Sequence, residues 1–158
     1  MYVSRYVAQL RESESALAEA LEALAEHHAG EPDVRMTAVL LASWSRQHVQ
    51  SLAAAAVRYG PEERQEGASL TRTPSSGPPS GNRRLLSDLH EAWLLGQRAH
   101  LHWTVLGQVA RALRDGELAA MAAELGAETD RQLAWLHTRI VEAAPQALIV
   151  GSAEPASQ

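Results

Sequence analysis

The side chains of this sequence that could do chemistry are glutamates and histidines that interrupt apolar stripes. Glu14, His48, Glu128 and Gln132 stand at positions where the helical spacing of apolar residues calls for an aliphatic side chain, each near the middle of its stretch. Carboxylates and imidazoles bind metal ions and also transfer protons. Because burying a carboxylate without partners costs several kcal/mol, this group needs a cation, a proton or hydrogen-bond donors.

The sequence leaves open two ways in which these buried side chains could be stabilised. In a third interpretation, the helices are rotated differently about their axes and these side chains face solvent. The first is a metal site made of Glu14, His48 and Glu128. The second is mutual hydrogen bonding in a buried polar network that fixes the register of the helices. The further candidate members of this network are Ser45, Gln97, His100, Arg131 and Gln132.

Four stretches with helical periodicity would position these side chains. Alanine and leucine dominate the apolar residues, which favours helices over strands. Gly30 and Gly60 end the first two stretches, Asp115 and Gly116 form a tight turn between the last two, and Pro145 ends the fourth. Asn82 is the expected N-cap of the third. The predicted helices span residues 3–28, 33–59, 83–114 and 116–143.

The segment 60–82 is rich in proline, glycine and serine, has no periodicity and is expected to be flexible. Neighbouring antiparallel helices need a connection of only about 2–8 residues. A helix of about 26 residues is roughly 39 Å long, and this segment could run along all of it. We therefore predict two antiparallel hairpins joined by a crossover. An up-down-up-down bundle with a loose insertion is the alternative.

Composition restricts the function further. The 158 residues suit one domain, a four-helix bundle over residues 1–150 with a disordered tail at 151–158. The absence of cysteine excludes disulfides, thiolate metal sites and cysteine nucleophiles. A net charge of −5 without a basic stripe argues against nucleic-acid binding. Neither a membrane span nor a signal peptide is evident, so the expected location is the cytoplasm.

The two hairpins, the long crossover, the mid-helix glutamates and His48 resemble the ferritin-like superfamily over residues 3–143. The stretch LRDGELAAMAAELGAETDRQLAWLHTRIVEAAPQAL is similar to small uncharacterised actinobacterial members of that group. The di-iron motif of the superfamily has a glutamate on the first and third helices and Glu-x-x-His on the second and fourth. The resemblance implies that Glu14, His48 and Glu128 match three of these ligands.

The chain departs from that motif at the other three ligands. Ser45 stands where the second helix should carry glutamate, Arg131 replaces the histidine of the fourth helix, and the third helix offers Gly96-Gln97 without a glutamate. The resemblance thus implies a degenerate, non-catalytic centre retained for stress or metal handling, with iron or manganese as the metal that such a centre would hold. The alternative is a homodimerising structural bundle with a buried polar network and no metal. A homo-oligomer is expected in either case.

Overall fold

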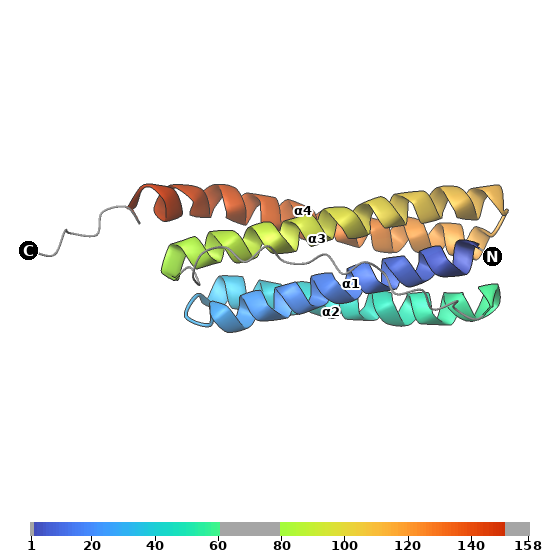
Figure 1. Ribbon diagram of the computed structural model, residues 1–158, viewed down its shortest axis with the longest axis horizontal. Helices are drawn as coiled ribbons and strands as arrows, with labels where there is room; N and C mark the ends of the chain where they lie inside the picture. Colours follow the sequence, from blue (N-terminus) through green and yellow to red (C-terminus); the bar gives the residue numbers. More distant parts are fainter. Residues whose placement is uncertain (1, 61–79, 151–158) are drawn as a thin grey trace, which may run out of the picture.

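All regular structure in the described part of the chain is helical. The computed structural model describes residues 2–60 and 80–150. The helices are α1 (Tyr2–His27), α2 (Pro32–Ala56), the short 3-10 helix η1 (Val57–Tyr59), α3 (Gly81–Ala112) and α4 (Gly116–Leu148). The four long helices lie along a common axis and form an elongated bundle (Figure 1). The predicted all-α class with four helices is confirmed.

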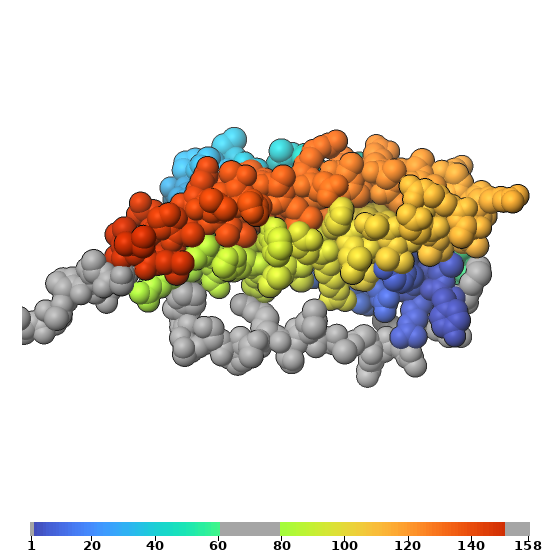
Figure 2. Space-filling model, turned by 90° about the horizontal axis from the view of Figure 1, so that it is seen from above, coloured from blue at the N-terminus to red at the C-terminus, as the bar shows by residue number. Residues whose placement is uncertain are grey.

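The directions of the helices follow from where each one begins and ends. Figure 1 shows α1 and α2 side by side, with their short connection at one end of the bundle, and the connection of α3 and α4 at the other end. Helix α2 ends at the end of the bundle opposite to the start of α3, so that these two helices run in the same direction. Helix α1 packs on α2 and α3, while α4 packs mainly on α3. Figure 2 shows the face formed by α3 and α4.

Two predicted features fall mostly or wholly outside the described residues. Residues 61–79 of the predicted linker and the predicted tail 151–158 are not described. Among the described helices, none is long and apolar enough to cross a membrane.

The apolar core consists of two clusters, one toward each end of the bundle. Their side chains come from the predicted helical stripes, because spacings of three and four residues place them on one face. One cluster includes Leu17, Leu21, Leu24, Val34, Leu41, Leu89 and Leu136. The other includes Val7, Leu10, Leu52, Trp103, Leu106 and Leu118. Each fully buried leucine contributes about 1.5–3 kcal/mol, so the two clusters hold the polar residues between them in place.

Glycines allow α3 and α4 to approach each other closely. A Cβ atom on Gly96 would lie 2.8 Å from Cδ2 of Leu133, and one on Gly126 would lie 3.3 Å from Cβ of Trp103. The break in the apolar stripe at Gly96 therefore makes room for a side chain of α4. In the same way, Gly126 makes room for Trp103, which places the indole ring at the middle of the bundle.

Two predicted helix boundaries are wrong. Helix α3 begins at Gly81 with Ser80 as its N-cap, so Asn82 lies inside the helix. Helix α4 continues through Pro145 to Leu148. A proline inside a helix removes one backbone hydrogen bond, but Ala147 is fully buried and the amide of Ile149 donates to the carbonyl of Pro145 at 3.0 Å. Packing and this capping bond outweigh the missing donor.

Asp115 caps α4 and joins it to the end of η1. Its Oδ1 accepts from the amide of Leu118 at 3.0 Å, and its Oδ2 accepts from the hydroxyl of Tyr59. We expect Asp115→Ala to lower the melting temperature by roughly 2–4 °C, because a lost N-cap costs about 1 kcal/mol in a typical protein. Differential scanning calorimetry measures this, with Asp115→Asn, which can still cap, as the control. Equal losses in both variants would contradict the capping role.

Candidate functional site

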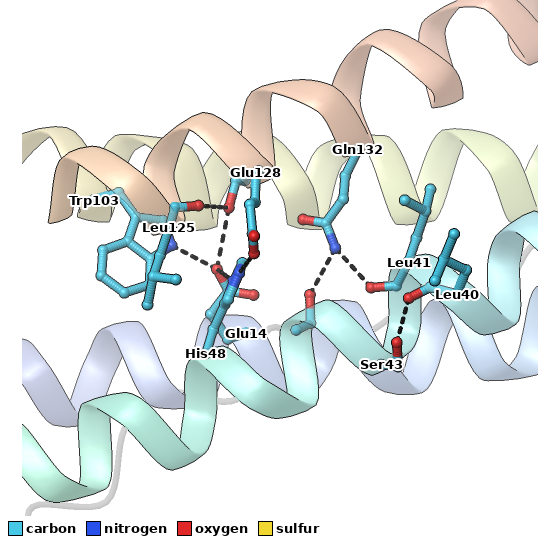
Figure 3. A network of polar contacts seen from close by, with 11 residues as sticks. Glu14, Leu40, Leu41, Ser43, His48, Trp103, Leu125, Glu128 and Gln132 are labelled. Atoms are coloured by element: carbon cyan, nitrogen blue, oxygen red, sulfur yellow. Dashed lines mark hydrogen bonds and ion pairs between the residues drawn. The ribbon is translucent and has the colours of Figure 1, made fainter. Parts of the chain in front are cut away.

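A polar layer lies at the middle of the bundle, between the two apolar clusters. Each long helix contributes to it: Glu14 comes from α1, His48 from α2, Trp103 from α3 and Glu128 from α4 (Figure 3). Glu14 and His48 are completely buried, and the side chain of Glu128 is 28% exposed. The structure thus brings together the three residues that the sequence analysis proposed as a metal site.

His48 lies between the two carboxylates. Its Nδ1 is 3.1 Å from Oε1 of Glu14, within ion-pair distance although not aligned as a hydrogen bond. Its Nε2 forms a hydrogen bond with Oε2 of Glu128 at 2.8 Å. A neutral imidazole has one N–H group, whereas an imidazolium ion has two. Two carboxylate oxygens on opposite sides of the ring therefore favour the protonated, cationic form of His48.

The pKa of His48 reflects a competition between burial and charge. Burial by itself would lower this pKa, because desolvation penalises the charged ring. The close contact with the charged Glu14, followed by the hydrogen bond and charge of Glu128, outweighs the burial and raises the pKa above its ordinary value. The raised pKa favours a positive charge on His48, between the buried carboxylate of Glu14 and the partly exposed one of Glu128.

One oxygen of Glu14 collects further donors. The indole Nε1–H of Trp103 donates to Oε1 of Glu14 at 2.6 Å, and the hydroxyl of Thr129 lies 3.4 Å from the same atom. The indole ring of Trp103 also packs edge-to-face on His48, with 5.7 Å between the ring centroids. The other oxygen of Glu14, Oε2, is buried without a hydrogen-bond partner among the described residues. Trp103 thus fixes the positions of both Glu14 and His48.

The sequence analysis did not assign Trp103 or Thr129 to this layer. A signal existed for Trp103, because it stands on an apolar stripe and a buried indole N–H usually needs an acceptor. Glu14, on the facing helix, was a candidate acceptor. Thr129 carried no such signal, since a threonine in a helix also bonds to a carbonyl one turn back, as Thr129 does with Leu125 at 3.2 Å.

A second polar group lies beside the central one. The amide nitrogen of Gln132 donates to the carbonyl oxygen of Leu41 at 2.8 Å and to the hydroxyl of Ser45 at 3.0 Å. Figure 3 shows this group next to Glu14 and His48, with separate hydrogen bonds. The predicted network is therefore divided into two parts, and Ser45 belongs with Gln132 to the second of them.

Three predicted members of the network lie elsewhere. Gln97 and Arg131 are exposed, and Nδ1 of His100 pairs with Oδ1 of Asp130 at 3.0 Å in a partly exposed position. One residue along a helix is a rotation of about 100°. Gln97 follows the buried Gly96 and Arg131 precedes the buried Gln132, so each is turned away from the core. Arg131 does not supply the charge that the sequence analysis considered for it.

Three other histidines form structural contacts, while His90 and His137 are exposed. Nδ1 of His27 and Nε2 of His28 each lie 3.0 Å from Oδ2 of Asp88, which ties the end of α1 to α3. Nδ1 of His102 lies 3.0 Å from Oγ of the buried Ser13. The hydroxyl of Ser13 donates to a backbone carbonyl one turn back at 2.9 Å. Because its proton is engaged there, Ser13 is not arranged as a nucleophile with His102 as its base.

The central group fits a proton better than a metal ion. Metal ligation by histidine needs a lone pair on one ring nitrogen, and both nitrogens of His48 face carboxylate oxygens. Within residues 2–60 and 80–150, no group of three or more histidine, aspartate or glutamate side chains has the geometry of a metal site. Binding of iron or manganese to Glu14, His48 and Glu128 stays a prediction.

Comparisons of this chain with models of protein families, with curated proteins and with solved structures give no match. The functional argument therefore rests on the residues and contacts of the polar layer.

The raised pKa of His48 makes the stability of the bundle depend on pH. A group whose pKa is higher in the folded than in the unfolded chain stabilises the fold fully below the unfolded value, about 6.5 for histidine. That contribution is lost as the pH rises through the folded value. We expect the melting temperature to fall as the pH is raised above about 6.5, measured by calorimetry in buffers of equal ionic strength.

His48→Gln is the control for this pH dependence. The pKa of His102 is lowered by burial and by the charge of Arg98. The contribution of His102 to the stability therefore rises with pH, and it does so equally in the wild type and in the variant. The difference between the two proteins isolates His48. A variant with the same alkaline slope as the wild type would contradict the assignment.

Proposed function

We propose that this chain is a non-catalytic, ferritin-like bundle protein that serves as a structural or interaction module. At its centre, the proton of His48 takes the place of the metal ions of that superfamily. Helices α2 and α3 run in the same direction, and each belongs to a two-helix hairpin, α1–α2 and α3–α4. This arrangement supports the ferritin-like topology. The common level of Glu14, His48 and Glu128 supports the correspondence of the centre.

One observation carries this proposal: His48 lies between Glu14 and Glu128, with a carboxylate oxygen at each ring nitrogen. An imidazolium ion in this place neutralises buried negative charge, as a metal ion would. The remaining ligand positions of the family agree with this interpretation, because Ser45 is bonded to Gln132 and Arg131 is exposed.

The enclosure of the centre supports a role other than catalysis. Glu14 and His48 have no exposed surface. A hollow of about 300 Å³ between α3 and α4 is lined by Trp103, His100 and Asp130, and none of Glu14, His48 and Glu128 borders it. A substrate in this hollow would meet the outside of Trp103 and not the acid–base groups, which an enzyme would need within hydrogen-bond reach.

A test of the proposal combines nitrogen NMR with metal analysis. We expect the ¹⁵N spectrum of His48 at neutral pH to show both ring nitrogens protonated, and the Glu14→Gln variant to lose this state at lower pH than the wild type. Protein produced with iron and manganese in the medium should contain neither metal in stoichiometric amount by mass spectrometry. His100→Gln is the control for assigning the NMR signals.

A degenerate metal-handling centre is the second candidate, and one observation favours it. Oε2 of Glu14 is buried without a hydrogen-bond partner among the described residues, and this leaves a free oxygen ligand beside the partly exposed Glu128. Stoichiometric iron or manganese that is lost in both Glu14→Ala and Glu128→Ala would establish this candidate and overturn the proton-based proposal.

A further inference from the structure

Between Met36 and Val57, no exposed position on the outward face of α2 and η1 carries a charged side chain, and the exposed Asp33, Arg35 and Arg58 lie just beyond this span. We call this face the outer stripe, and its residues follow one another at spacings of three and four, apart from the adjacent Val39 and Leu40. Four of them are large apolar side chains that are more than half exposed: Met36 at 73%, Val39 at 54%, Leu40 at 52% and Val57 at 82%. The others are the exposed residues Ser43, Gln47, Gln50 and Ala54. Solvent-facing helix surfaces normally carry charged residues, as α1 does with its exposed Glu12, Glu19 and Glu26.

The charges near the outer stripe are few: Arg46 lies within its span, and Asp33, Arg35 and Arg58 lie at its ends. Apart from the buried His48, the charged residue between positions 36 and 57 is Arg46. Its guanidinium forms two hydrogen bonds with the carboxylate of Glu22 on α1, at 3.0 and 2.8 Å. A partner that covers the stripe therefore buries no unpaired charge. A shallow hollow of about 530 Å³ along the stripe is lined by Val39, Ser43, Gln47 and Gln50 together with the ion-paired Glu22 and Arg46, and it gives room for the partner's side chains.

We propose that a second copy of this chain docks on the outer stripe as an antiparallel, two-fold symmetric pair of α2 helices. In a two-fold contact the same patch serves on both copies and must be complementary to itself. With the axis beside Gln47, Met36 lies opposite Val57 of the second copy, and Val39 and Leu40 lie opposite Ala54. Large apolar side chains thus meet smaller ones.

The polar residues and the ends of the stripe are matched in the same register. Ser43 lies opposite Gln50 of the second copy, and the two Gln47 amides meet at the axis, where each can donate and accept. At the ends, Asp33 pairs with Arg139 of α4 at 3.2 Å and Arg58 pairs with Glu117 of α4 at 2.6 Å, so both lie on the flank toward α4. An antiparallel pair brings Asp33 toward Arg58 of the second copy, so that charges of opposite sign approach these ion pairs at each end. The helix dipoles are also favourably opposed.

This inference deepens the proposed interaction role but does not depend on the protonation of His48. The chain contains no cysteine, so single cysteine variants report on one contact each. We expect Gln47→Cys to form a disulfide-linked dimer under mild oxidation, because the two sulfurs meet at the axis. Leu101→Cys, at a 60% exposed position of α3, is the matched control and should stay monomeric on non-reducing gels.

The orientation is tested with the two ends of the stripe. Met36→Cys alone should not cross-link, because in an antiparallel pair the two copies of this position are roughly 30 Å apart. A mixture of Met36→Cys and Val57→Cys proteins should give the heterodimeric disulfide, identified by mass spectrometry. A self-linked Met36→Cys dimer would overturn the antiparallel arrangement.

Light scattering on the unmodified protein tests the self-association itself. We expect a dimer that dissociates on dilution, since a contact one helix wide is small among stable interfaces. Leu40→Glu should shift the protein to the monomer at every concentration, while Leu101→Glu should leave the dimer intact. A wild-type monomer at all concentrations, or equal loss in both variants, would overturn the proposal. The NMR spectrum of His48 would be unaffected by either result, so this failure is distinguishable from a failure of the proposed function.

Discussion

Replacing His48 by leucine is expected to lower the free energy of unfolding by about 3–5 kcal/mol, the usual cost of breaking a buried ion pair from one side. The physical reason is that Glu14 stays fully buried and loses the cation 3.1 Å away. Its bond from Trp103 remains, but a neutral donor does not replace a positive charge. Urea denaturation at neutral pH, followed by circular dichroism, measures the loss.

Two further variants show whether charge is the cause. His100→Leu removes a histidine that pairs with Asp130 at a partly exposed position, and we expect a loss below about 1 kcal/mol, as for surface ion pairs. Adding Glu14→Gln to His48→Leu should recover part of the stability, because the amide oxygen still accepts from Trp103 and no charge is buried. A double variant less stable than His48→Leu would show that charge burial is not the main cost.

Trp103→Ala should destabilise the bundle by about 3–5 kcal/mol, as expected for a large aromatic side chain that leaves a cavity. Trp103 is 2% exposed, packs over Gly126 and belongs to one of the two apolar clusters. Its loss removes apolar contacts and the indole donor to Glu14 at the same time. The measurement is again urea denaturation, with the m-value compared to check that the variant unfolds in one step.

Trp103→Phe separates the two contributions. Phenylalanine keeps most of the apolar contact but cannot donate to Glu14, and an unsatisfied buried acceptor costs about 1–3 kcal/mol. We expect Trp103→Phe to show a loss in that range and to shift the ¹⁵N signals of His48, since the ring that packs on it at 5.7 Å is changed. A Trp103→Phe protein as stable as the wild type would mean that the bond to Glu14 contributes nothing.

Much of the architecture follows from local patterns in the sequence. The spacing of leucines and alanines predicts four long helices, because the helical repeat places residues three and four apart on one side. The same spacing singles out Glu14 and His48 as interruptions, and the structure buries both completely. The helix ends were less accurate at Asn82 and Pro145, since tertiary packing of residues such as Ala147 outweighs the local signal.

The sequence by itself therefore determined the helices of this protein and placed Glu14, His48 and Glu128 at one level, since helices of similar length align their middles. Only the tertiary structure decided how these residues pair. It placed His48 between the two carboxylates, brought Trp103 onto Glu14 and turned Gln97 and Arg131 outward. The reason is physical: periodicity is a property of one helix, whereas the rotation of each helix about its axis and the close approach at Gly126 depend on how all four pack together.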